Sequence, residues 1–419
     1  MSDIQSPQTT VIVGAGQAGS EVATSLRQQG YTGRVVLIGD EPHLPYRRPP
    51  LSKAYLAGEA DAASLLIKPR ATYEKAKVEL LIPAQVVGVN RDASRVELAD
   101  GRVQTYDKLV LATGGRPRPL ELPGADAPNV LTLRTLADVD AIRREMQPGH
   151  RLVVVGGGYI GLELAAVAVK LGLKVTVLES APRVLVRVTA PEMSAFYERV
   201  HREAGVDVRT GVALQHFDQQ AGRVSAAVLA DGTRIQTDVV VVGIGLMPNV
   251  ELARNAALEV ADGIVVDEHG RTSDPDILAV GDCANQPNAW LGRRLRMESV
   301  PNAMEQARTV AATLCGKLQA FRAVPWFWSD QYDLKLQMVG LSQGYDQVVL
   351  RGEPSSRSFC AFYLCDGAVI AVDAVNRAGE FMVAKRLVAE RVRADAQCIA
   401  DEQQPLQALL TPASVATPS

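Results

Sequence analysis

Residues 10–19 read TVIVGAGQAG, and about 140 residues later residues 151–161 read RLVVVGGGYIG. In each stretch an apolar, mostly β-branched run leads into the spacing G-x-G-x-x-G and then into a helical pattern. A second apolar run follows each copy and closes on an acid, Asp40 in the first copy and Glu179 in the second. Strand, glycine turn, helix and strand in this order predict a βαβ unit that binds a dinucleotide. One such match can arise by accident, but two in full context are a strong signal.

The glycines of each copy have separate expected tasks. In order along each copy they make the tight turn, let a pyrophosphate approach bare backbone, and let helix and strand pack closely: Gly14, Gly16 and Gly19 in the first copy, and Gly156, Gly158 and Gly161 in the second. The N-terminus of the following helix then faces the phosphates with its positive dipole end. The alternative is that these glycines only make tight turns.

The acid that closes each unit is expected to accept hydrogen bonds from ribose hydroxyls. Asp40 has this role in the first copy, although the neighbouring Glu41 could replace it. At Glu179 a 2′-phosphate would meet a like charge, so NADH is favoured over NADPH. Arg183 and Arg187 follow closely and could soften that repulsion.

The remaining sequence organises around this duplication. The 419 residues predict roughly three domains at about 150 residues each, and 47% hydrophobic residues are enough for a core in each. Alternating segments with D-G turns follow each glycine copy and close on a strand, the first at residues 108–112. From Val324 the pattern changes to alternating strands followed by a helical stretch, which predicts an α+β domain. The expected boundaries are 1–118 and 243–323 for the first dinucleotide domain, 119–242 for the second, and 324–419 for the third.

Composition excludes several classes of function. A net charge of −3 provides no global field for nucleic acid or an anionic membrane. The apolar runs are shorter than the roughly 20 residues that span a bilayer, and the polar N-terminal sequence has no signal-peptide pattern, so we expect a soluble, cytoplasmic protein. The five cysteines are dispersed and contain no C-x-x-C, so neither a disulfide framework nor a metal site is expected.

A second signal concerns the first glycine copy. Residues 272–282 read TSDPDILAVGD and resemble the second FAD motif of flavoprotein reductases with two dinucleotide domains, in which the aspartate, here Asp282, binds the ribityl chain. The segment ATGGRPR at 112–118 resembles the A-T-G motif of the same superfamily. Within it the chain, over residues 9–400, is similar to the NADH-dependent reductases of 2Fe–2S ferredoxins and rubredoxins. This similarity rests on the segments LPYRRPPLSKAYL, GGGYIGLELA, VGIGLMPN, AVGDCA, ESVPNAMEQA, WFWSDQYDLKLQMVGL and NRAGEF.

This resemblance implies a glutathione-reductase-like α/β fold with two Rossmann-like domains, one for FAD and one for NAD, and a C-terminal α+β domain. It also implies the site. The expected FAD-side residues are Gly14, Ala15, Gly16, Gly19, Asp40, Arg48, Lys53, Ala112, Thr113, Gly114, Arg118, Asp282, Val300 and Trp328, with Glu298 as a further candidate. The expected NAD-side residues are Gly156, Gly158, Tyr159, Ile160, Gly161, Glu163, Glu179 and Gly245.

Lys53 and Glu163 are the expected catalytic residues. In the family the lysine of R-P-P-L-S-K lies against the flavin ring, where a fixed cation stabilises the reduced, anionic form. The matching glutamate lies near the nicotinamide, where it can pair with the lysine. Lys53 as a surface lysine, Glu163 as a helix-start acid and Trp328 as a core residue are the alternatives. The region 45–53 contains no cysteine, which argues against the thiol-dependent branches of the superfamily.

The function that the resemblance implies is a flavoprotein oxidoreductase in electron transfer, a ferredoxin reductase. Hydride from NADH is expected to be passed on through noncovalent FAD as single electrons to an acidic 2Fe–2S ferredoxin, which serves a monooxygenase or dioxygenase. Arg293, Arg294 and Arg296 form a candidate landing patch, with a solvated loop as the alternative. A rubredoxin reductase, an NADH oxidase, the flavin module of a nitrite reductase and a redox-responsive binding protein like apoptosis-inducing factor remain as alternatives.

Overall fold

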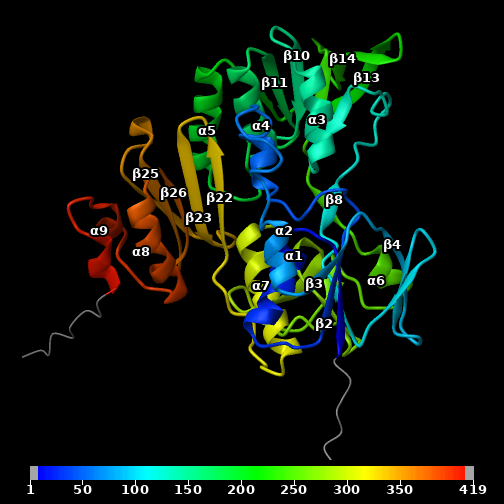
Figure 1. Ribbon diagram of the computed structural model, residues 1–419. Coiled ribbons are helices and arrows are strands. Elements are labelled where there is room, and N and C mark those ends of the chain that lie inside the picture. Colours follow the sequence, from blue (N-terminus) through cyan, green and yellow to red (C-terminus); the bar gives the residue numbers. More distant parts are fainter. Residues whose placement is uncertain (1–7, 411–419) are drawn as a thin grey trace, which may run out of the picture. The chain divides into compact units, whose positions relative to one another are not determined.

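The computed structural model describes residues 8–410, so the ends of the first and last expected domains, 1–7 and 411–419, lie outside the described residues. The chain groups into two compact units, each made of discontinuous segments (Figure 1). Within the described residues, the first unit comprises 8–49, 60–116 and 246–323, and the second comprises 50–59, 117–245 and 324–410. The predicted α/β fold class is confirmed, while the three expected domain boundaries stay a prediction.

The first unit is built on a parallel sheet in the order β19-β7-β1-β2-β3. Its strands are β1 (Thr9–Val13), β2 (Arg34–Ile38), β3 (Val78–Leu81), β7 (Lys108–Leu111) and β19 (Ile277–Ala279). β1 is central, with Val11 opposite Val36 on one side and Leu109 on the other. The strand expected at residues 108–112 is therefore β7, beside β1.

Alternation along β1 gives this sheet two packed faces. Ile12 points to the face covered by α1 (Gln17–Gln28) and α7 (Val300–Leu314), where it packs with Val22 and Val310. Val11 and Val13 point to the opposite face, which an antiparallel sheet helps to cover. That sheet consists of β4 (Val86–Asn90), β5 (Arg95–Leu98) and β6 (Val103–Thr105). Smaller elements of this unit are α2 (Arg70–Lys75), β17 (Leu246–Pro248), α6 (Glu251–Asn255), β18 (Ile264–Val265), β20 (Ala284–Asn288) and β21 (Arg293–Arg296).

The second unit repeats this plan with a parallel sheet in the order β12-β11-β10-β16-β9. Its strands are β9 (Val130–Thr132), β10 (Arg151–Val155), β11 (Lys174–Glu179), β12 (Asp207–Thr210) and β16 (Val239–Val242). Its helices are α3 (Leu136–Glu145), α4 (Tyr159–Lys170) and α5 (Pro191–Glu203). An antiparallel sheet of β13 (Leu214–Gln220), β14 (Arg223–Leu229) and β15 (Arg234–Gln236) again follows the helices. The duplication predicted from the glycine copies is thus a structural one.

Residues 324–410, predicted as a third, α+β domain, have strands followed by helices and belong to the second unit. An antiparallel sheet in the order β22-β23-β26-β25-β24 packs against α8 (Ala378–Ala389). Its strands are β22 (Trp326–Gln331), β23 (Leu334–Gly340), β24 (Gln347–Arg351), β25 (Phe359–Cys365) and β26 (Ala368–Val375), and α9 (Ala396–Ala400) follows. In residues 8–410, we find no helix that is both long and apolar enough to cross a membrane.

Candidate functional site

The glycine turn of the first unit has the shape that a dinucleotide requires. Gly14 has φ +111°, and a Cβ there would lie 2.1 Å from the carbonyl oxygen of Ala112. At Gly19 a Cβ would lie 1.9 Å from the oxygen of Gly14, so helix and turn are in direct backbone contact. At Gly16, by contrast, a Cβ would meet no described atom within 4 Å. The first and third glycines are needed for the fold, and the second leaves open space before the N-terminus of α1, which fits a pyrophosphate.

The second unit repeats these three environments. Gly156 has φ +112°, and a Cβ there would lie 2.5 Å from the oxygen of Gly243. At Gly161 a Cβ would lie 2.2 Å from the oxygen of Gly156, whereas Gly158, the residue before α4, has no described atom within 4 Å of that position. Both units therefore have residues that fit a dinucleotide.

The two strand-end acids differ in their surroundings. Asp40 is exposed just after β2, and the neighbouring Glu41 is bound to Arg48 at 2.7 Å and to Tyr46 at 2.5 Å. Because Glu41 is already engaged, Asp40 is the acid of the two that is open to solvent for a ribose.

Glu179 is held at the glycine turn of its unit. It ends β11, and its carboxylate accepts the N–H groups of Gly157 and Ala181, each at 2.8 Å. Of the two arginines expected near it, Arg183 donates to the hydroxyl of Ser194 at 2.5 Å, whereas Arg187 is exposed, with its guanidinium facing Gly245. Arg183 is thus engaged away from Glu179.

Most of the other residues expected near FAD in the first unit lie at the ends of strands. Ala112, Thr113 and Gly114 follow β7, and the Thr113 hydroxyl donates to the carbonyl of Asn249 at 2.6 Å. Asp282 lies in a short 3-10 turn after β19, where Gly281 has φ +80°. Two further expected FAD-side residues are Ala15 and Val300. Ala15 lies against Gly39, where an added Cβ would be 2.4 Å from the Cβ of Ala15, and Val300 begins α7. Glu298 pairs with Arg296 at 2.6 Å.

Four further expected residues lie in the second unit. Tyr159 and Ile160 are the first residues of α4, with the Ile160 side chain 49% exposed. The backbone N–H of Arg118 donates to the carbonyl of Gly245 at 2.9 Å. The strand β16 ends just before Gly245, so the 118–245 contact lies at the carboxyl edge of the sheet, where such sheets bind ligands.

Lys53 and Glu163 are in direct contact within the second unit. Their ion pair measures 2.6 Å from Nζ to Oε2, with the Lys53 side chain 19% exposed and that of Glu163 4% exposed. Glu163 projects from the first turns of α4, and Lys53 follows the turn Pro49–Ser52. A surface lysine and a solvated helix-start acid would be far more exposed. A shielded pair of this kind is more strongly coupled than an exposed one.

Two residues that the sequence analysis did not single out complete the surroundings of Glu163. Ser52 donates to Oε2 at 2.5 Å, and Ser329 donates to Oε1 at 2.6 Å. Serine is common and gives no sequence signal by itself, although Ser52 lies inside R-P-P-L-S-K and Ser329 inside WFWSDQ.

Trp328 is half-buried on β22, with its ring 5.6 Å from that of Trp326. Trp326 also contacts Phe381 and carries the ammonium of Lys385 4.8 Å from its ring centroid. Trp326 is therefore the more deeply engaged of the two in the packing against α8.

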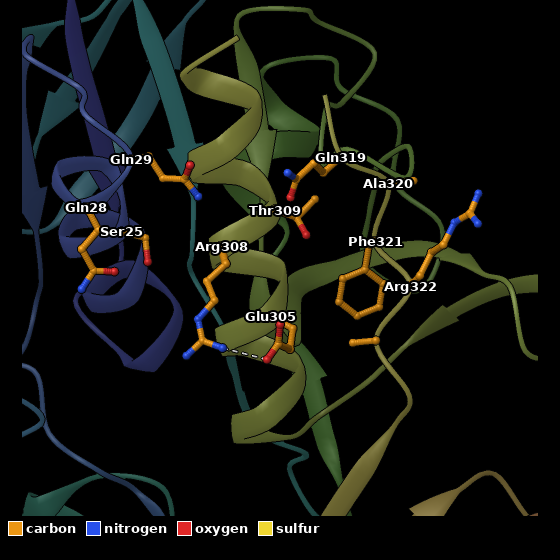
Figure 2. Close-up of a pocket in the computed structure, with 11 residues that line it drawn as sticks. Ser25, Gln28, Gln29, Glu305, Arg308, Thr309, Gln319, Ala320, Phe321 and Arg322 are labelled. Carbon is orange, nitrogen blue, oxygen red and sulfur yellow. Dashed lines mark hydrogen bonds and ion pairs between the residues drawn. The ribbon is translucent and has the colours of Figure 1, made fainter. Parts of the chain in front are cut away.

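Two other features of the first unit lie apart from the glycine turn. A polar pocket of about 420 Å³ lies at the C-terminal end of α1, opposite the end that follows Gly16, and Figure 2 shows its residues. Ser25, Gln28 and Gln29 line it from α1, and Glu305, Arg308 and Thr309 from α7.

In the candidate landing patch, Arg296 is 10% exposed and paired with Asp262 and Glu298, and Arg294 donates to backbone carbonyls. The positive charges of Arg294 and Arg296 are thus largely engaged in contacts within the protein, and their role as a landing patch stays a prediction.

Comparison with known proteins agrees with this geometry. Residues 8–307 match the model of the pyridine nucleotide-disulphide oxidoreductases, and residues 326–410 match that of the reductase C-terminal domain. The chain belongs to the pyridine nucleotide-disulphide oxidoreductase family. Membership implies FAD and a nicotinamide dinucleotide as cofactors, which fits the two glycine turns.

Comparison with individual relatives identifies a narrower group within this family. The chain is 51% identical to putidaredoxin reductase of Pseudomonas putida, over 96% of this chain and 97% of that protein. It is 40% identical to the ferredoxin–NAD(+) reductase component of the anthranilate 1,2-dioxygenase system of Burkholderia cepacia, over 96% and 98%. The crystal structure of a covalent putidaredoxin reductase–putidaredoxin complex matches with a TM-score of 0.94 and 50% identity, covering 97% of this chain and 99% of that one. The predicted resemblance to ferredoxin reductases is confirmed.

Proposed function

We propose that the protein is an FAD-dependent NADH:ferredoxin reductase that transfers electrons from NADH to a 2Fe–2S ferredoxin serving an oxygenase. The observation that carries this is the 51% identity to putidaredoxin reductase over 96% of the chain. FAD, when bound, converts the two electrons of a hydride into two single-electron transfers. The chain itself would bind and orient the two dinucleotides and would stabilise the charge that develops on the flavin.

The two dinucleotides are assigned to the two glycine turns. The first turn and Asp282 would hold FAD, because the backbone before α1 is open at Gly16 and Asp282 lies after β19 at the same edge of the sheet. The turn at Gly158 would hold the nicotinamide dinucleotide. In each case a bare helix N-terminus supplies N–H donors and positive dipole to the phosphates.

Lys53 would supply positive charge to the flavin ring, and Glu163 would fix its position. The 2.6 Å pair and the low exposure of both side chains support this, because an ammonium held in a shielded site loses little freedom when charge develops beside it. The pair also keeps Lys53 from being an uncompensated charge when no negative flavin is present.

We further propose that NADH is preferred over NADPH. The carboxylate of Glu179 is fixed by two backbone N–H groups at the end of β11, where an adenosine ribose is expected. It can accept ribose hydroxyls but repels a 2′-phosphate, and Arg183 is engaged with Ser194 rather than with that position.

Steady-state reduction of cytochrome c by NADH, with a panel of purified ferredoxins and rubredoxins as mediators, tests the function. We expect turnover that depends on one or more 2Fe–2S ferredoxins and is higher with NADH than with NADPH. Turnover with rubredoxins alone would favour a rubredoxin reductase. Rapid oxygen reduction without any carrier would favour an NADH oxidase, and either result would overturn the proposal.

A further inference from the structure

Behind Glu163, a chain of hydrogen bonds runs through the second unit to a histidine that is 0% exposed. Ser329, which donates to Glu163, accepts a hydrogen bond from the Gln331 amide at 3.2 Å. The oxygen of Gln331 lies 2.8 Å from Nε2 of His201, and Nδ1 of His201 lies 2.9 Å from the hydroxyl of Tyr332. Ser329 and Gln331 share the buried face of β22, and His201 comes from α5.

The direction of every bond in this chain follows from donor chemistry. An amide oxygen can only accept, so Nε2 of His201 carries the hydrogen that Gln331 receives. Nδ1 of a neutral histidine then accepts, and the Tyr332 hydroxyl donates to it. Burial lowers the pKa of His201 to about 4, so the ring stays neutral near pH 7. Each donor thus meets an acceptor, from Tyr332 at the outer end to Glu163 at the inner end.

The histidine tautomer decides where the Ser329 hydrogen goes. With the hydrogen on Nδ1 instead, Gln331 would have to turn its NH₂ toward His201 and its oxygen toward Ser329. The serine would then have a single hydrogen for two acceptors, Gln331 and Glu163. The carboxylate would lose its donor at Oε1, the oxygen that does not face Lys53.

We propose that Gln331, His201 and Tyr332 are positioning residues that lock the Ser329 hydrogen onto Glu163 and so fix the carboxylate against Lys53. This inference rests on the proposed function, in which the Lys53–Glu163 pair serves the flavin. None of the three touches a reacting atom. Their effect is to hold Oε1, so that Oε2 stays directed at Lys53 and Ser52.

The first test reads the tautomer directly. In holoenzyme labelled with ¹⁵N-histidine, we expect His201 to be neutral with hydrogen on Nε2 and not to titrate between about pH 5.5 and 9. Its signals would be assigned with His201→Gln. Tyr332→Phe removes the hydroxyl but keeps the ring, which lies 5.1 Å from the imidazole, and should admit the other tautomer. A His201 with hydrogen on Nδ1 in the wild type, or one that titrates near pH 7, would overturn the proposal.

The second test measures stopped-flow reduction of the flavin by NADH. Loss of the hydrogen bond to the charged Glu163 predicts a limiting rate about 10- to 150-fold lower in Ser329→Ala, with little change in the NADH dissociation constant. Gln331→Leu, which removes the donor to Ser329, should lower the limiting rate in the same direction. Ser329→Thr and His201→Gln keep the needed donors and should restore most of the rate. Tyr345→Phe, which removes a half-buried hydroxyl in the same sheet layer, is the matched control for Tyr332→Phe.

Glu163→Gln separates this inference from the proposed function. If Glu163→Gln is slow while flavin reduction in Ser329→Ala and Gln331→Leu proceeds at the wild-type rate, the positioning role of Gln331, His201 and Tyr332 fails and the role of the Lys53–Glu163 pair stands. If Glu163→Gln reduces at the wild-type rate, both fail. Where the proposal holds, Ser329→Ala should add little to the effect of Glu163→Gln, because the acceptor whose position it sets is already altered.

Discussion

Asp373 gives a prediction whose sign and approximate size follow from its burial. This carboxyl lies on β26 and is buried, and it accepts hydrogen bonds from the hydroxyls of Tyr363 and of Thr189, the latter at 2.9 Å. Burial raises its pKa from an ordinary 3.8 to about 6, against the opposing effect of those two donors. Ionising Asp373 is therefore harder in the folded protein than in the unfolded chain.

The size follows from the pKa change. A rise of about two units corresponds to about 3 kcal/mol, at about 1.4 kcal/mol per unit. Because the folded pKa is the higher one, the folded protein binds the proton more tightly, and stability falls as pH rises from about 4 to about 6. Above that range both states are ionised and the contribution is constant. About half of the loss, on the order of 1 to 2 kcal/mol, falls above pH 5.

Asp373→Asn should remove this pH dependence while keeping an oxygen acceptor for Tyr363 and Thr189. Urea unfolding of wild type and variant between pH 5 and 8 gives the difference in free energy, in which other titrating groups cancel. From pH 5 to pH 8, we expect the free energy of unfolding of the variant to rise by about 1 to 2 kcal/mol relative to that of the wild type. Asp366→Asn, an exposed turn residue of the same sheet, is the control. A difference that stays flat with pH would refute the reasoning, as would a carboxyl ¹³C titration of Asp373 near its ordinary pKa.

Three further predictions concern the cofactors. Lys53→Met should keep the fold and the FAD but slow flavin reduction by about 10- to 1000-fold in stopped-flow measurements, and an unchanged rate would exclude the charge role. Gly19→Ala should lower the FAD content sharply, because its Cβ would lie 1.9 Å from a backbone oxygen. Gly16→Ala, whose Cβ would meet no described atom within 4 Å, should fold normally and weaken FAD binding. Equal FAD content in the two variants, measured by absorbance, would contradict this. Wild type should show a kcat/KM for NADPH about 10- to 150-fold below that for NADH, and Glu179→Ala should narrow the gap mainly by improving NADPH; an unmoved ratio would make Glu179 a structural acid only.

The fold was predictable because its main signals are local. The two glycine copies fix strand, turn and helix within about 30 residues each, and an alternating pattern after Val324 marks the antiparallel sheet. The interaction of Lys53 with Glu163 was anticipated only through the family, since 110 positions separate them and no periodicity links them.

The supporting shell of Glu163 was not predictable. Ser329, Gln331 and His201 come from a strand and a helix whose pairing depends on how the C-terminal sheet packs on α4 and α5, and each residue type is commonplace. Burial of His201 is likewise a tertiary property: the sequence shows a histidine on an amphipathic helix but not which face is covered. Sequence patterns report periodicity, whereas these hydrogen bonds depend on contacts distant in the chain.

The discontinuous make-up of the first unit has a consequence for biosynthesis. Its sheet needs β19, and the helix that packs on α1 ends only at Leu314, so the N-terminal strands cannot complete their core until about three quarters of the chain has been made. The parallel sheet of the second unit spans only residues 130–242 and is available for folding much earlier. We therefore expect the usual order, in which N-terminal domains fold first during translation, to be reversed. A ribosome-stalled chain ending near residue 290 should carry a protease-resistant second βαβ core, while its first 110 residues remain open to cleavage and unable to retain flavin.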